Sequence, residues 1–245
     1  MRELIKSAKR AVVKVSAQKS GSGFLVPGGY AVTCAHVLDG TASVTISNDY
    51  LGSTKAQPVE VDEGRDLAIL RLNLAKLPHL DLGSYGDFEE GDEVAFLGYP
   101  LAINRHQTQR AIVSYKGRIK FEDLAEPVDA FCLDGAVNKG NSGGPVVAVE
   151  TGTVIGIVNA KLGALSESLR ESRRLHETIK GLGLGGMVQF GVIEVDGRRL
   201  AGFDPAATSD TLAEVVDFLD NYTNAGIGYA ISVDYVRQVM SRIGS

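Results

Sequence analysis

The chain has 245 residues, of which 44% are hydrophobic and 22% charged, and its formal net charge is −5. This composition is typical of a folded globular protein with a sizeable core, and it excludes a global basic field that would attract nucleic acid. The apolar runs are strand-sized, and basic residues interrupt the N-terminal stretch MRELIKSAKRAVVKVSAQ, so neither a membrane span nor a signal-peptide core is predicted. We therefore expect a cytoplasmic protein with no membrane or nucleic-acid partner, or a periplasmic or secreted one if a leader has been removed.

Short apolar segments recur along the first 160 residues, separated by turns rich in glycine, asparagine or aspartate. They are predicted strands at 11–17, 21–26, 30–35, 43–47, 67–72, 93–99, 110–119, 130–135, 144–149 and 153–160. Regularly spaced short strands with turn signals indicate a β-sandwich or barrel. The polar segment 77–92 divides them into two sets, which predicts two small barrels joined there.

The pattern changes after residue 160. The stretch 164–183 is charged and compatible with a helix, and 211–222 shows a clearer helical periodicity with a capping-box spacing at its start. The segment 232–243 predicts a terminal helix whose buried face carries Val236, Val239, Met240 and Ile243.

Two cysteines, Cys34 and Cys132, are too few for a disulfide framework. Both lie in apolar, strand-like contexts and are predicted to be buried free thiols. The sequence contains no Cys/His cluster with metal-ligand spacing, so no metal and no cofactor are expected.

The sequence KGNSGGPVVAV (139–149) places Ser142 among glycines, which fits either a nucleophile or a polar residue in a turn. A serine nucleophile needs a histidine base, a carboxylate that orients the base, and N–H donors for the oxyanion. His36 ends an apolar strand and could instead simply pack. Asp66 precedes another strand and could be only a cap. His79, His106 and His176 lie in polar surroundings and look solvated.

An α/β-hydrolase elbow is the other reading of the GxSxG pattern, and it requires a helix after the serine and the order Ser, acid, His. Here strand-like runs follow Ser142, and no aspartate lies between Ser142 and His176, which is the only downstream histidine. The α/β-hydrolase reading is therefore excluded.

The stretches GSGFLV, TCAHV, RDLAIL and GNSGGPVV, in that order, resemble the trypsin-like (chymotrypsin-clan) serine peptidases, and most closely the HtrA-family protease domain. The resemblance covers roughly 4–160 and 226–243 and leaves 161–225 unmatched. It implies an all-β fold of two six-stranded antiparallel β-barrels, with a helical insertion and a C-terminal helix. The N-terminal barrel (1–85) would carry the histidine and the aspartate. The C-terminal barrel (86–245, with the insertion 161–225) would carry the serine. HtrA proteases usually continue into a PDZ domain, and none is expected here.

The resemblance also implies roles for individual residues. Ser142 is expected to be the nucleophile, His36 the general base and acid, and Asp66 the orienting carboxylate, with the N–H groups of Gly140 and Ser142 as the oxyanion hole. A further set would bind substrate: Ala136 at the base of the primary pocket, and Asn159, Ala160 and Lys161 on the strand that pairs with the substrate main chain.

An uncharged pocket base predicts small or medium apolar residues before the scissile bond, because a buried lysine or arginine would lack a partner there. Lys139 and Lys161 could favour an acidic residue at a neighbouring subsite, and simple solvation of both side chains is the favoured alternative. The expected function is a serine endopeptidase acting on peptide or protein substrates, with the 161–225 insertion as a possible contact for a regulatory protein. The alternative is a catalytically latent binding module on a protease fold.

Overall fold

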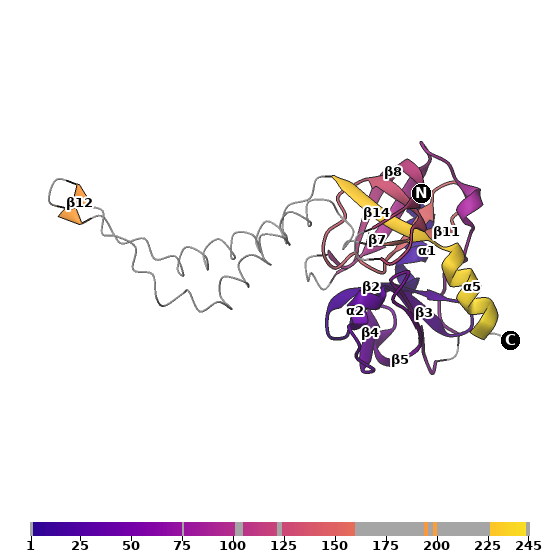
Figure 1. Ribbon diagram of the computed structural model, residues 1–245. Coiled ribbons are helices and arrows are strands. Elements are labelled where there is room, and N and C mark those ends of the chain that lie inside the picture. The colour runs from indigo at the N-terminus through magenta and orange to yellow at the C-terminus, as the bar shows by residue number, and fades with distance from the viewer. Residues whose placement is uncertain are drawn as a thin grey trace. The chain divides into compact units, whose positions relative to one another are not determined.

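The computed structural model describes residues 2–74, 76–100, 105–121, 124–159, 194–195, 198–199 and 226–243. Its first six strands close into a barrel in the order β1-β2-β3-β6-β5-β4, and all of their pairings are antiparallel (Figure 1). These strands are β1 (Val12–Ser16), β2 (Ser20–Val26), β3 (Tyr30–Thr33), β4 (Val44–Asn48), β5 (Gly52–Asp62) and β6 (Leu67–Arg71).

A second barrel closes in the order β10-β11-β14-β9-β8-β7, again with antiparallel pairing. Its strands are β7 (Glu93–Gly98), β8 (Gln107–Ile119), β9 (Val128–Asp134), β10 (Pro145–Ala148), β11 (Val154–Val158) and β14 (Ile227–Ser232). Closure leaves neither sheet with an unpaired edge. The predicted chymotrypsin-like pair of six-stranded barrels is confirmed.

Among the described residues, the helical elements are α1 (Arg2–Ala11), α2 (Ala35–Leu38), the short 3₁₀ helix η1 (Tyr85–Asp87) and α5 (Asp234–Ile243). Both barrels belong to one compact unit, residues 1–163 with 224–245, and residues 164–223 form another. Within the second unit, the two-residue strands β12 (Glu194–Val195) and β13 (Arg198–Arg199) pair antiparallel. The predicted helices at 164–183 and 211–222 lie outside the described residues.

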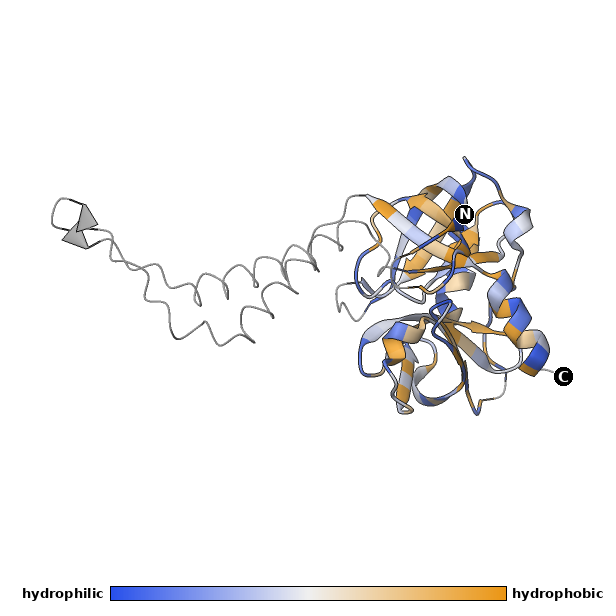
Figure 2. Ribbon diagram, in the orientation of Figure 1, coloured by the Kyte–Doolittle hydropathy of each residue, from blue (hydrophilic) through white to orange (hydrophobic). Residues whose placement is uncertain are grey.

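Hydrophobic residues recur along the strands of both barrels (Figure 2). Phe24, Ile46 and Leu70 are fully buried in the first barrel, and Phe131 and Leu133 are fully buried in the second. Burying an apolar side chain of this size stabilises the fold by about 1.5–3 kcal/mol. The two packed cores therefore make both barrels rigid enough to hold a site between them.

The C-terminal helix begins and ends close to its predicted bounds, and its apolar face is the predicted one. Val236 and Val239 are buried, while Met240 and Ile243 are partly buried and pack against the same core as the first barrel. Figure 1 shows α5 leaving β14 of the second barrel and running alongside the first. The helix thus ties the two barrels together.

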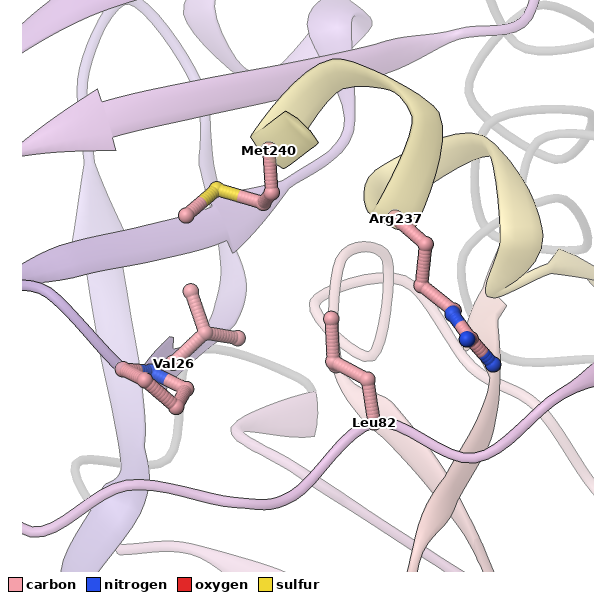
Figure 3. Close-up of a pocket in the computed structure, with 5 residues that line it drawn as sticks. Val26, Leu82, Arg237 and Met240 are labelled. Atoms are coloured by element: carbon pink, nitrogen blue, oxygen red, sulfur yellow. The ribbon is translucent and has the colours of Figure 1, made fainter. Parts of the chain in front are cut away.

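A pocket of about 340 Å³ lies between the end of β2 and α5 (Figure 3). The Arg237 guanidinium at its rim donates a hydrogen bond to the Gly83 carbonyl, 3.0 Å away. The pocket is lined by Val26, Pro27, Leu82, Arg237 and Met240. None of the predicted site residues belongs to this lining, so the pocket is separate from the candidate site.

Two predictions about single side chains are wrong. Cys34 is buried and outside any disulfide, as expected, but Cys132 is only partly buried. On β9 it lies between Phe131 and Leu133, which face inward, so its own side chain faces outward. His106 was expected to be solvated and is instead partly buried, with its ring edge-on to that of Tyr99. This burial lowers the pKa of His106.

Among the described residues, no helix is both long enough and apolar enough to cross a membrane.

Candidate active site

The pairing of β3 with β6 brings His36 and Asp66 together. Thr33, at the end of β3, lies opposite Ala68 on β6, so the helix that follows β3 meets the turn that precedes β6. His36 is in that helix, α2, and Asp66 is the last residue of that turn. The Asp66 backbone is left-handed, with φ at 53°, a conformation that aspartate tolerates better than most residues.

Asp66 is buried, with 5% of its surface exposed, and accepts three hydrogen bonds. The His36 main-chain N–H donates to Oδ1 at 2.8 Å, His36 Nδ1 lies 2.6 Å from Oδ2, and Asn159 Nδ2 donates to Oδ2 at 2.7 Å. Because a carboxylate can only accept, the Nδ1 atom of His36 carries the proton. The neutral imidazole then keeps its lone pair on Nε2, as a general base requires.

The segment before Ser142 is a type II turn. The Asn141 N–H donates to the Asn138 carbonyl at 3.0 Å, and φ is positive at Gly140 (94°) but not at Lys139. A positive φ at the third turn position defines type II and favours glycine there. In this turn type the peptide between Lys139 and Gly140 is flipped relative to type I, which decides where the Gly140 N–H points.

Gly143 and Gly144 permit the close backbone approach expected of them. A Cβ on Gly143 would lie 2.2 Å from the Ser22 carbonyl oxygen, and one on Gly144 would lie 2.2 Å from that of Leu97. Ser142, which precedes them, is buried. Its carbonyl accepts a hydrogen bond from the Ser22 N–H at 2.8 Å. The loop that carries Ser142 (138–144), here called the serine loop, therefore contacts β2 of the first barrel directly.

Cys34 packs beside the His36–Asp66 pair, and its thiol lies 3.4 Å from the Val158 carbonyl. The ligand atoms of Cys34, His36 and Asp66 all lie within 4.8 Å of one another, so these residue types and distances could in principle hold a metal ion. However, Nδ1 of His36 and Oδ2 of Asp66 are already joined by their hydrogen bond. A metal between them would have to break it.

The predicted substrate-binding residues are placed only in part. Ala136 follows β9 and is partly buried, and its neighbour Val137 packs over Gly228, where an added Cβ would lie 2.2 Å from Val137 Cγ2. Asn159 is 1% exposed. Ala160 and Lys161 lie outside the described residues.

Two structural partners of the site were not predicted. The first is the Asn159 carboxamide, which turns inward to Asp66, whereas the sequence suggested only a substrate-binding role for Asn159. The second is Ser22, which contacts the serine loop from β2. The GSGFLV motif contains Ser22, but nothing in the sequence marks its hydroxyl as a contact of the loop that carries Ser142.

A double antiparallel barrel with a partly buried histidine hydrogen-bonded to a buried aspartate, and with a glycine-rich loop that carries a serine, defines the chymotrypsin-like class of structure. The family model of the trypsin-like peptidase domain matches residues 21–157, more than half of the sequence, and the chain belongs to this family.

Two of the relatives share one name. A probable periplasmic serine endoprotease, DegP-like, from Pseudomonas savastanoi pv. phaseolicola is 35% identical over 141 residues, which are 57% of this chain and 29% of the relative. The protein of the same name from Halomonas elongata is 36% identical over 138 residues, 56% and 28% of the two chains. The chain thus spans under a third of the length of these relatives. Their names place them in the periplasm, so the expectation of a cytoplasmic location gains no support from them.

Solved structures agree on the fold. The HtrA-type protease AlgW, determined with a tripeptide, superposes with a TM-score of 0.66 at 23% identity, covering 99% of this chain and 62% of AlgW. The active form of the Rv3671c protease from M. tuberculosis gives a TM-score of 0.65 at 20% identity, covering 99% and 84%.

Proposed function

We propose that this chain is a serine endopeptidase that hydrolyses peptide bonds through an acyl-enzyme. Ser142 is the nucleophile, His36 the general base and then acid, and Asp66 the carboxylate that orients His36. The observation that carries the proposal is the 2.6 Å contact between His36 Nδ1 and Asp66 Oδ2. It fixes the imidazole tautomer whose Nε2 can take a proton.

The chemistry then follows the order in which charge develops. His36 Nε2 removes the proton as Ser142 Oγ attacks the scissile carbonyl, and the carbonyl oxygen becomes an oxyanion held by the N–H groups of Gly140 and Ser142. His36 next gives the proton to the leaving amine, which departs and leaves an acyl-enzyme. Water, activated by the same histidine, releases the acid and restores Ser142.

The primary pocket is proposed to accept small or medium apolar side chains. Ala136 at its base offers no carboxylate, and the packing of Val137 over Gly228 supports an apolar wall beside it. Main-chain pairing of the substrate with residues 159–161 and a preference for an acidic neighbour through Lys139 and Lys161 belong to the same proposal. The names of the relatives favour a periplasmic location.

Labelling with a fluorophosphonate probe tests the reaction class, with Ser142→Ala as the control. We expect stoichiometric labelling of the wild-type chain and none of the variant. An unlabelled wild-type chain would contradict an assembled active site and favour the latent binding module. The same assay on a variant with 161–225 shortened tests whether that segment regulates the site, because a regulatory segment would change the labelling rate.

A further inference from the structure

Ser22 lies on β2, is fully buried, and uses every polar group it has. Its hydroxyl donates to the Gly140 carbonyl at 2.5 Å and accepts from the Tyr99 N–H at 2.8 Å. Its N–H donates to the Ser142 carbonyl at 2.8 Å, and its own carbonyl accepts from the Thr33 hydroxyl at 2.7 Å. Because all of its polar groups form hydrogen bonds, Ser22 is held in one position by contacts with both barrels.

Two of these bonds reach Gly140 and Ser142, the two residues whose N–H groups are proposed to bind the oxyanion. The Ser22 hydroxyl holds the carbonyl of the first, and the Ser22 N–H holds the carbonyl of the second. These two residues of the second barrel are thus both anchored to one residue of the first.

The anchor acts on the turn that sets the direction of the Gly140 N–H. The peptide between Gly140 and Asn141 is fixed on both sides, because its N–H donates to Asn138 and its carbonyl accepts from Ser22. The preceding peptide, which carries the Gly140 N–H, rotates against this fixed plane when a type II turn changes to type I. Holding that plane fixes one of the two ends about which the peptide that carries the Gly140 N–H would have to rotate.

Close packing at Gly98 surrounds this contact. A Cβ on Gly98 would lie 2.7 Å from the Ser22 hydroxyl oxygen and 2.7 Å from Asn141 Oδ1. Glycine at position 98 therefore leaves space for the Ser22 hydroxyl to reach the Gly140 carbonyl.

We propose that Ser22 is a positioning residue for the oxyanion hole, holding the Gly140 and Ser142 donors in their working directions from the opposite barrel. This inference rests on the proposed endopeptidase function. N–H donors that stabilise an oxyanion must point at its position before the reaction begins, because reorienting them during the reaction would cost the free energy that they contribute.

The test compares Ser22→Ala with Ser232→Ala. Ser232 is equally buried, and its hydroxyl accepts from the Asp234 N–H at 3.1 Å, at the start of α5 and outside the serine loop. For a fluorogenic peptide substrate, Ser22→Ala should lower kcat by about tenfold to a hundredfold while KM changes by less than about twofold, since the lost effect belongs to the transition state. The affinity for a peptide aldehyde, whose adduct carries the oxyanion, should fall by a similar factor.

Ser232→Ala should leave kcat and the aldehyde affinity at the wild-type level. If kcat is equal in the two variants, Ser22 is only structural and the inference is overturned. Should Ser22→Ala fail to fold, Ser22→Cys replaces it, because a thiol fills the space but is a weak donor. Wild-type kcat in that variant would likewise overturn the inference.

Amide hydrogen exchange of the 138–144 segment separates this inference from the proposed function. Exchange in this segment should be faster in Ser22→Ala than in Ser232→Ala, whether or not the wild-type chain turns over. A wild-type chain that resists fluorophosphonate defeats the proposed function, and exchange then still decides whether Ser22 holds the loop. Unchanged exchange in an active enzyme defeats the inference alone.

Discussion

Asn159 donates its side-chain N–H to the same oxygen of Asp66 that is bonded to the His36 ring. Asn159 follows the last residue of β11 in the second barrel, whereas Asp66 belongs to the first barrel. The bond therefore crosses between the barrels and stops the carboxylate from rotating away from the imidazole. Because Asn159 fixes the Asp66 carboxylate, the carboxylate in turn holds the His36 ring in the narrow range of orientations that proton transfer requires.

Replacing Asn159 with alanine should lower kcat/KM by about tenfold to a hundredfold, because a misplacement of the base by about 1 Å has an effect of that size. Steady-state hydrolysis of a fluorogenic peptide measures it. Asn48→Ala is the matched control, since the Asn48 carboxamide donates to the Arg10 and Val12 carbonyls in the first barrel. An equal loss of activity in the two variants would contradict a role for Asn159 at the site.

Exchanging Asp66 for asparagine should reduce kcat by about 10⁴ with little change in the fold. An asparagine side chain is nearly isosteric and tolerates the left-handed backbone of Asp66, but its amide N–H can donate to Nδ1 and stabilise the wrong tautomer. Kinetics combined with thermal unfolding separate chemistry from stability. A variant that keeps more than a tenth of the wild-type kcat would show that Asp66 does not set the tautomer.

Tyr85 should make stability fall at alkaline pH. Its hydroxyl donates to the Ala130 and Gly117 carbonyls at 2.9 and 3.2 Å, and burial together with the negative charge of Asp129 raises its pKa to about 12. Because the folded state holds the phenolic proton more tightly than the unfolded chain does, this stabilisation is complete below about pH 10 and is lost as the pH rises through about 12.

Urea unfolding at intervals from pH 9 to 12 measures this effect. Tyr85→Phe should be less stable than wild type at pH 9, and the difference should shrink toward pH 12. Tyr50→Phe, at a site that is 61% exposed, controls for loss of a phenol alone. A difference between wild type and Tyr85→Phe that stays constant across this range would argue against titration of Tyr85.

The strands that the sequence predicted are those whose apolar residues form dense runs, such as the run in β6. The strand β5 was missed because GSTKAQPVEVD is mostly polar, and only Ala56 within it is buried. Its membership of the barrel comes from pairing with β4 and β6, with an irregular register near Pro58. Pairing partners distant in the chain are a tertiary effect that local pattern does not contain.

The residues of the candidate site also fall into those that the sequence predicted and those that it did not. His36, Asp66 and Ser142 stand in short motifs with chemical meaning, so they could be named from the sequence. The contacts of Asn159 and Ser22 arise only when the two barrels meet, since their partners lie 93 and 118 residues away. Their residue types alone, one asparagine and one serine among many, carried no comparable signal.

Because the serine loop packs directly on β2, we expect Gly143→Ala to be far more harmful than Gly52→Ala. Both glycines have positive φ, 86° and 73°, so each alanine bears the left-handed cost of about 1–2 kcal/mol. An added Cβ at Gly52 meets nothing within 4 Å, whereas at Gly143 it lies 2.2 Å from the Ser22 carbonyl oxygen and 2.4 Å from the Thr33 hydroxyl.

Gly143→Ala must therefore push the serine loop off β2, which should abolish fluorophosphonate labelling and lower the free energy of unfolding by more than Gly52→Ala does. Gly52→Ala should keep the wild-type labelling rate. Urea unfolding and labelling of both variants check this pair of expectations. Equal destabilisation with labelling retained in both would mean that the loop does not depend on its contact with Ser22 and Thr33.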